Sequence, residues 1–230
     1  MTPFADALLS WFAAEARPLP WREARTPYRV WVSEAMLQQT QVKTVIPYFG
    51  RWLERFPTVE TLAAAPLGDV LKAWEGLGYY RRARLLHEGA KVVVTEHGGR
   101  LPETYSDLLK LPGFGPYTAA AVASIAFGES VLAVDGNVKR VASRLFRLSG
   151  EVRALEVERQ LNPHLPGQDA GTFNEALMDL GATVCTPRSP HCGACPVSGF
   201  CEAFQTGEVG KFPQPKKRKA VPELCRYALV

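Results

Sequence analysis

The sequence lacks any long run of apolar residues. Its apolar runs are short, as at residues 131–134, and none approaches the roughly 20 residues that a helix needs to cross a membrane. The first residues, MTPFAD, do not combine a basic segment with a following apolar one, so they do not resemble a secretory signal. We therefore expect a protein without membrane association, located in the cytoplasm, where thiols stay reduced.

Patterns typical of β-strands are scarce. The β-branched runs at 92–94 and 131–134 are too few and too far apart for a sheet, and we interpret them as buried helical turns or extended connectors. Apolar residues spaced three or four apart predict helices over 29–46, 62–74, 105–111, 116–126 and 138–148. Frequent Pro and Gly residues separate these segments. The sequence thus predicts an all-α fold without internal repeats.

Charge of one sign is weak across most of the chain. The 27 Lys and Arg residues face 23 Asp and Glu residues, which leaves a net charge of +4. The stretch 211–219 (KFPQPKKRK) supplies this basic excess, so the rest of the chain is close to neutral. A polyanion would have to be held by local basic clusters. The hydrophobic fraction of 47% suffices for a buried core and excludes wholesale disorder.

Cysteine is rare but concentrated. Four of the five cysteines lie at Cys185, Cys192, Cys195 and Cys201, and Cys225 stands apart. Thiols packed this closely in a reducing compartment favour a metal or cluster site over disulfides. The spacing C-x6-C-x2-C-x5-C contains one C-x2-C pair where zinc sites usually have two. It therefore favours a [4Fe–4S] cluster over zinc, with a structural role.

A tight glycine turn lies between two predicted helices, at LPGFGPYT (111–118). Gly113 and Gly115 allow the backbone to turn sharply and expose its amides, and Pro116 suits a first helical position. Free N–H groups at a helix start bind phosphate without side-chain charge. The segment indicates a phosphate-binding helix–hairpin–helix, and an ordinary helical hairpin is the alternative.

Two carboxyl groups have contrasting sequence environments. Glu34 lies in a nearly apolar helical segment, where burial would raise its pKa and favour the acid. Asp135 precedes a predicted helix, whose amides and dipole favour the anion. An acid paired with an anion is the arrangement that cleaves glycosidic bonds. The alternatives are a solvated helical Glu and a simple helix cap.

Basic and aromatic residues occur together at GLGYYRRAR (76–84), and Lys139, Arg140, Arg144 and Arg147 follow Asp135. Cations contact phosphates, and rings can fill a gap in a base stack. We interpret both clusters as contacts to nucleic acid, although solvated helix faces often carry such charges.

Several motifs resemble a known family. The segments LPGFGPYTAAAV, AVDGNVKRV and the cysteine motif are similar to the endonuclease III superfamily of DNA glycosylases. WVSEAMLQQTQVKTVIPYF, GLGYYRRAR and FNEALMDLGATVCTP resemble its MutY-type adenine DNA glycosylases, over roughly residues 17–212. The resemblance implies a monomer that binds double-stranded DNA, flips out an adenine mispaired with 8-oxoguanine or guanine, and hydrolyses its glycosidic bond.

The resemblance also implies two lobes with a DNA groove between them. A six-helix lobe would cover residues 25–134 and contain the helix–hairpin–helix. An iron–sulfur lobe would combine residues 1–24 and 135–207, and residues 208–230 would form a basic linker. Because such enzymes usually continue into a domain that reads 8-oxoguanine, we expect a truncated form or a partner that supplies this contact, with weakened preference for 8-oxoguanine.

The family pattern suggests a role for each matching residue. Glu34 would be the general acid and Asp135 the carboxylate beside the sugar cation, with Tyr117 and Asn137 positioning them. The remaining assignments are Arg17, Trp21, Arg22 and Glu175 in the adenine pocket; Gln39 and Tyr79 inserted into the duplex; Gly113, Gly115, Arg81 and Arg82 against DNA; and Cys185, Cys192, Cys195 and Cys201 on the cluster.

Tyr117 stands where the lyase branch of the family carries a Schiff-base lysine. A phenol cannot form an imine, so we expect a monofunctional enzyme with water as the final nucleophile. Two alternatives stay open: a thymine or uracil mismatch glycosylase on the same scaffold, and a non-catalytic helix–hairpin–helix DNA-binding protein.

Overall fold

The computed structural model describes residues 1–214, and this part of the chain contains helices and turns without a strand. The predicted all-α class is therefore confirmed. The predicted linker beyond residue 214 and Cys225 lie outside the described residues. No helix of the described part is long and apolar enough to cross a membrane.

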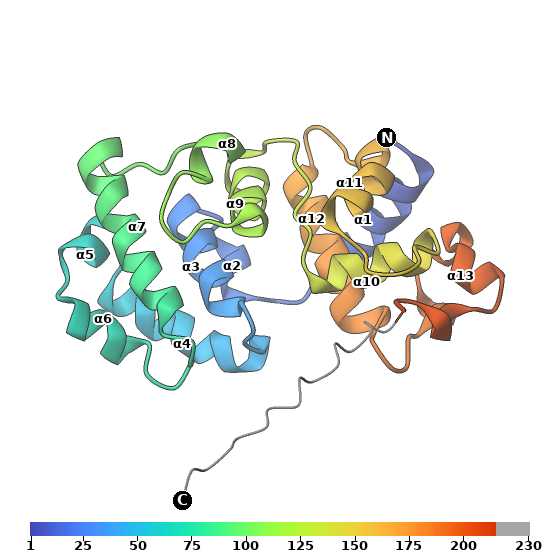
Figure 1. Cartoon of the computed structure of the whole chain (residues 1–230), viewed down its shortest axis with the longest axis horizontal. Coiled ribbons are helices and arrows are strands. Elements are labelled where there is room, and N and C mark those ends of the chain that lie inside the picture. Colours follow the sequence, from blue (N-terminus) through green and yellow to red (C-terminus); the bar gives the residue numbers. More distant parts are fainter. Residues whose placement is uncertain (215–230) are drawn as a thin grey trace, which may run out of the picture.

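Two groups of helices lie next to each other (Figure 1). The first group contains α2 (Pro20–Glu23), α3 (Pro27–Leu37), α4 (Val42–Arg55), α5 (Val59–Ala64), α6 (Leu67–Ala73), α7 (Arg81–His97), α8 (Tyr105–Leu108) and α9 (Pro116–Phe127). The second contains α1 (Pro3–Glu15), α10 (Gly136–Leu145), α11 (Ala154–Leu161), α12 (Ala170–Asp179) and α13 (Glu202–Gln205). A π-helical turn, Leu180–Val184, continues α12.

Each group has its own hydrophobic core. Trp31, Trp52 and Trp74 are fully buried in the first, which extends from Leu19 to Ala123. The second combines the apolar face of α1 with residues 132–212, Phe212 included. Leu19 was assigned to the iron–sulfur lobe from the sequence but packs in the first core. Phe212 was assigned to the linker but packs in the second core. The exact lobe boundaries remain a prediction.

The two helix groups contact each other where α9 packs against α12. At Gly171 a Cβ atom would lie 2.5 Å from the carbonyl oxygen of Ser124 and 2.7 Å from Cα of Ile125, so the backbones approach too closely for any other residue. Asn174 forms hydrogen bonds to the extended connector that precedes α10, residues 131–134. It accepts from the Ala133 amide and donates to Val131 O and Ser124 Oγ at 2.9–3.0 Å.

Two helix predictions were wrong in extent. The segment 29–46 is split, because α3 ends at Leu37 and α4 begins at Val42. The carbonyls of Ala35 and Met36 accept hydrogen bonds from Arg82 in place of amides from a further helical turn. The segment 62–74 is split at Pro66, which has no N–H group to continue a helix.

The remaining local predictions fared better. The 116–126 helix is α9 (Pro116–Phe127), and the helix predicted at 138–148 is α10, which begins two residues earlier and ends at Leu145. Residues 105–111 form only the short α8. Val92–Val94 lie in α7, and residues 131–134 form an extended connector, as expected.

The close approach at Gly171 predicts that Gly171→Ala destabilises the fold by about 1–3 kcal/mol, since the new methyl group must displace the α9 backbone. Denaturant unfolding measures this change. The matched control is Gly50→Ala in α4, where a Cβ atom would meet nothing within 4 Å. There the higher helix propensity of alanine should increase the free energy of unfolding by about 0.5–1 kcal/mol. Equal effects of the two substitutions would contradict the proposed packing.

Candidate active site

A cavity of about 720 Å³ lies between the two helix groups. Its wall includes Glu34 from α3, Tyr117 from α9, Asp135 from the start of α10, and Glu175 and Asp179 from α12. Residues separated by up to 145 positions therefore meet in one polar cavity. Both predicted catalytic carboxyl groups line it.

Glu34 is the more deeply buried of these two carboxyl groups, with 5% exposure. Burial raises the pKa of Glu34 to about 7. The hydrogen bond from the Tyr117 hydroxyl to Oε2, at 2.6 Å, opposes this shift, whereas the nearby charges of Asp135 and Glu175 add to it. Near neutral pH the side chain therefore exists as a mixture of acid and anion, in keeping with its apolar sequence environment.

Asp135 is the N-cap of α10, as the sequence predicted. Its Oδ1 accepts the Val138 amide at 2.7 Å, and its Oδ2 accepts Nδ2 of Asn137 at 2.9 Å. The amide contacts that favour the anion, which the sequence predicted, are therefore present. Desolvation by burial raises the pKa of Asp135 above its usual value, although these hydrogen bonds oppose the rise. A helix cap predicts the bonds but not the burial.

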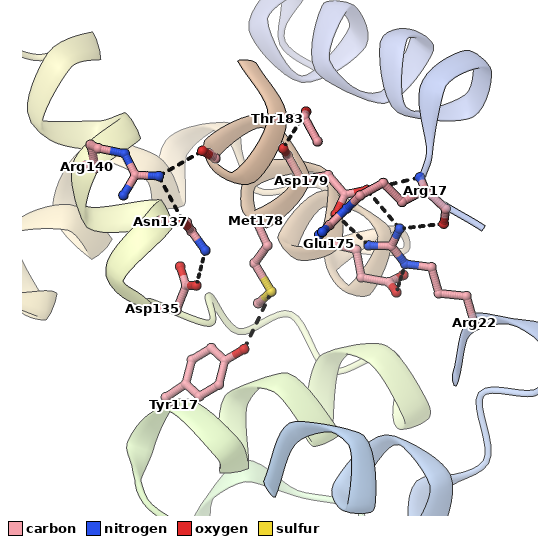
Figure 2. A network of polar contacts seen from close by, with 11 residues as sticks. Arg17, Arg22, Tyr117, Asp135, Asn137, Arg140, Glu175, Met178, Asp179 and Thr183 are labelled. Carbon is pink, nitrogen blue, oxygen red and sulfur yellow. Dashed lines mark hydrogen bonds and ion pairs between the residues drawn. The ribbon is translucent and has the colours of Figure 1, made fainter. Parts of the chain in front are cut away.

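Tyr117 occupies the first turn of α9, between the hairpin and the cavity. Burial and the charges of Glu34 and Asp135 raise the pKa of Tyr117 well above its ordinary value. The phenol therefore keeps its proton and acts as a donor toward Glu34. Figure 2 also shows its contact with Sδ of Met178, at 3.6 Å.

Three arginines and two carboxylates form an ion network beside the cavity, and Figure 2 shows two of these arginines, Arg17 and Arg22, with Glu175 and Asp179. Arg22 donates to Oε1 of Glu175 at 2.9 Å and to both oxygens of Asp179, and Arg17 also binds Asp179. Arg25 pairs with Oε2 of Glu175 at 2.6 Å. Trp21 is buried nearby against Phe49. The four predicted adenine-pocket residues therefore share one region of the cavity wall.

Asp179 is a member of this network that sequence reasoning missed. It is fully buried, and burial by itself favours its acid form. The hydrogen bonds and charges of Arg22 and Arg17 outweigh burial and lower the pKa of Asp179. The available signal was its spacing of four residues from Glu175 in an apolar helix, which places both carboxylates on one face.

The arginines of α10 do not form the free basic face expected from the sequence. Arg140 donates to Oδ1 of Asn137, as Figure 2 shows, and to the carbonyls of Gly181 and Cys185, at 2.8–2.9 Å. Arg144 is buried and binds the carbonyls of Thr186, Pro187 and Phe212. Arg147 follows the end of α10 and pairs with Glu208 near the surface. Their cations organise the protein interior and the region around the cysteines.

The four clustered cysteines surround a small hollow lined also by Val141, Leu145, Leu180 and Val197. Their thiols are free, and Arg144 Nη1 donates to Sγ of Cys185 at 3.3 Å. Among residues 1–214, no group of three or more His, Cys, Asp or Glu side chains is arranged to hold a single metal ion. Four thiols around an apolar hollow, with a cationic donor to one sulfur, fit a multi-iron cluster.

The residues predicted to contact DNA divide into two classes. Gly113 adopts φ of 86° in the hairpin, and Gly115 caps α9. Gln39, Tyr79 and Arg81 are exposed, and Gln39 and Tyr79 have positive φ values of 58° and 48°. Arg82 differs, because its guanidinium is directed at internal carbonyl groups. The contacts of Arg82 in the structure are all with protein groups, and its predicted contact with DNA stays a prediction.

Comparison with known proteins identifies the family. Residues 32–166 match the family model described as HhH-GPD superfamily base excision DNA repair protein. This chain belongs to that superfamily. Residues 185–201 of this HhH-GPD protein match the iron–sulfur binding domain of endonuclease III. The predicted choice of a [4Fe–4S] cluster over zinc is confirmed, while the assignment of individual ligands remains a proposal.

Curated relatives of this HhH-GPD protein include the adenine DNA glycosylase of Homo sapiens, which is 48% identical over 225 residues. The match covers 90% of this chain and 40% of the relative. That of Buchnera aphidicola (Schizaphis graminum) is 39% identical and matches 99% of this chain and 67% of the relative. The chain thus spans less than half of the human relative.

Solved structures of similar fold include a thermostable thymine-DNA glycosylase, with a TM-score of 0.80 and 31% identity over 88% of this chain and 95% of that one. A non-covalent endonuclease III–DNA complex aligns with a TM-score of 0.75 and 26% identity, over 88% and 94% of the two chains. The predicted helix–hairpin–helix glycosylase fold is therefore confirmed.

The cysteine geometry predicts that Cys195→Ser removes most of the broad visible absorption of the iron-loaded protein, because a ligand of the cluster is lost. The matched control is Cys225→Ser, which changes the cysteine outside the motif and should keep the spectrum. Iron analysis and visible absorption measure both variants. A colourless wild-type protein that contains zinc would contradict the assignment.

Proposed function

We propose that this protein is a monofunctional DNA glycosylase of base excision repair that removes adenine mispaired with 8-oxoguanine or guanine. The observation that carries the proposal is the presence of Glu34 and Asp135 in one cavity, each in a different polar environment. The adenine DNA glycosylases among its relatives support the choice of base.

Glu34 would act as the acid. With a pKa of about 7 it keeps its proton in a large fraction of molecules at neutral pH, and it would protonate N7 of an adenine turned into the cavity. The C1′–N9 bond then breaks, and its electron pair leaves with the base. Tyr117 donates to the carboxylate that remains, so the proton loss is partly compensated.

Asp135 would stand beside the cationic sugar. Its carboxylate is fixed by the Val138 amide and the Asn137 side chain, so it need not reorganise as positive charge develops on the sugar. Water adds to C1′ and gives up a proton to a nearby carboxylate, which leaves an abasic site. Since Tyr117 cannot form an imine, the chemistry stops there without strand cleavage.

Recognition of adenine would fall to the network beside the cavity. The guanidinium of Arg22 and the carboxylate of Glu175 offer a donor and an acceptor for the edge of a base, and Asp179 holds Arg17 and Arg22 in place. Trp21 would provide an apolar wall. Opening the pair between Arg22 and Glu175 is the change that an incoming base would require.

Double-stranded DNA carrying the mismatch would be the partner of a monomeric enzyme in the cytoplasm or nucleoid. Gly113 and Gly115 would bind phosphate through backbone amides, and Arg81 would add a cation. Gln39 and Tyr79 would enter the duplex beside the flipped base. Gln39, Tyr79, Arg81 and Gly115 are exposed, as this role requires, and Gly113 is partly buried.

A thymine mismatch glycosylase is the second candidate, because the thermostable thymine-DNA glycosylase shares 31% identity and a TM-score of 0.80. Single-turnover excision on A:8-oxoguanine, A:G and T:G duplexes, followed by alkali, separates the two. We expect abasic sites from both adenine duplexes and no cleavage before alkali. Release of thymine without adenine would contradict the proposal.

Removal of either carboxyl should slow this reaction. We expect Glu34→Gln and Asp135→Asn each to lower the excision rate by about 10²–10⁴-fold, while binding to the mismatched duplex persists. Glu158→Gln, at a glutamate outside the cavity, is the matched control. Unchanged excision in both test variants would favour a non-catalytic DNA-binding protein.

The excision rate should also depend on pH through Glu34. Because the protonated acid is the active form, the rate should be high below a pH of about 7 and fall above it. Tyr117→Phe removes a hydrogen bond that lowers this pKa, so the falling limb should move to higher pH. A limb that stays in place or moves down in the Tyr117→Phe variant would show that Glu34 does not control it.

A further inference from the structure

Arg82 lies between two turns that carry the exposed residues Gln39 and Tyr79. The Gln39 turn (residues 38–41) joins α3 to α4, and the Tyr79 turn (residues 74–80) joins α6 to α7. Arg82 belongs to the first turn of α7. Its side chain is half-buried beneath both turns, although its position beside Arg81 suggested a surface cation.

One guanidinium bonds to both turns at the same time. Nη1 donates to the carbonyls of Ala35 at 3.0 Å and Met36 at 2.8 Å, and also to that of Gln38. Nη2 donates to Oγ1 of Thr40 at 3.1 Å and to the carbonyls of Leu77 and Gly78, each at 3.2 Å. The two nitrogens therefore bridge segments about 40 residues apart.

These contacts suit arginine in particular. The acceptors include carbonyls at the end of α3, where a helix has unsatisfied C=O groups and attracts positive charge. The planar fork reaches both turns at once, which the single ammonium of lysine cannot do. The guanidinium also lies over the rings of Trp74 and Tyr79, at 5.3 and 5.5 Å from their centroids.

Both turns hold a backbone conformation that their residue types disfavour. Gln39 and Tyr79 have backbone φ angles of 58° and 48°, and residues other than glycine rarely adopt such values. Surrounding contacts must therefore maintain these conformations. Tyr79 is 63% exposed, so its own side chain has little packing to hold it.

The Gln39 turn is also connected to the cavity. Nε2 of Gln38 donates to Oγ1 of Thr118 at 3.2 Å, and Thr118 follows Tyr117 on α9. Glu34 lies one helical turn before Gln38 on α3. The Gln39 turn is thus tied to α9 next to Tyr117, although neither Glu34 nor Asp135 bonds to the turn itself.

We propose that Arg82 is a positioning residue that holds the Gln39 and Tyr79 turns as one rigid unit, so that both side chains enter the duplex together. This inference rests on the proposed function, because it gives the two exposed residues a mismatched duplex to enter. Arg82 itself contacts backbone and not phosphate.

The test is a double-mutant cycle on binding to a duplex whose mispaired adenosine carries a 2′-fluorine and resists cleavage. Arg82→Lys keeps the positive charge but can bond to only one of the two turns, so it should weaken binding about tenfold. In a Gln39→Ala/Tyr79→Ala background the same change should cost less than about twofold, since Arg82 acts through these side chains. Arg100→Lys, at an exposed arginine, is the matched control.

A second variant distinguishes the proposed positioning role from a general loss of folding. Thr40→Val removes one acceptor of Nη2 and leaves Arg82 in place, and should weaken binding about threefold, again only when Gln39 and Tyr79 are present. For active variants, the pH midpoint of excision should match that of the wild type. Additive losses in the cycle, unchanged binding in Arg82→Lys, or a shifted midpoint would overturn the inference.

The cycle also separates this inference from the proposed function. A wild-type protein that binds the mismatched duplex without excising adenine would refute the glycosylase proposal, and the cycle would still report on Arg82. Active wild-type protein with independent effects of Arg82 and the two inserted side chains would refute the inference alone.

Discussion

The packing of α9 on α12 brings chemistry from distant parts of the chain into one cavity. Gly171 permits the contact because a side chain there would meet the α9 backbone. Tyr117 at one end of α9 and Glu175 on α12 then face the same space. Glu34 belongs to the first helix group and Asp135 to the second, so without this contact the two carboxyl groups would not face one cavity and could not act on the same nucleotide.

Burial in this cavity decides how each ionisable group behaves. Glu34 has one strong donor, Tyr117, and burial dominates, so its pKa is high. Asp135 has amide donors from α10 that oppose the same effect. Asp179 has two arginines, which reverse the effect and lower its pKa. The pKa values of three carboxyl groups within one site are thus shifted differently because their hydrogen-bond and charge partners differ. Such a difference allows one carboxyl group to act as an acid and another as an anion.

Much of this organisation could be predicted from the sequence where the signal was local. The cysteine spacing indicated an iron–sulfur cluster, the glycine turn indicated a hairpin, and the position of Asp135 indicated a helix cap. The break between α3 and α4 could not be predicted, because it depends on Arg82, more than 40 residues away. The inward direction of Arg140 and Arg144 was missed for the same reason: the carbonyls that they bind come from distant segments.

The acid role proposed for Glu34 requires that its carboxyl group hold a proton in a large fraction of molecules near neutral pH. Infrared difference spectra between wild type and Glu34→Gln would show the band of its protonated carboxyl group directly, without any DNA. We expect this band to be present under mildly acidic conditions and to disappear with a midpoint at a pH of about 7. A Glu34 that is already fully ionised at a pH of about 5, near the range of an ordinary glutamate, would contradict it.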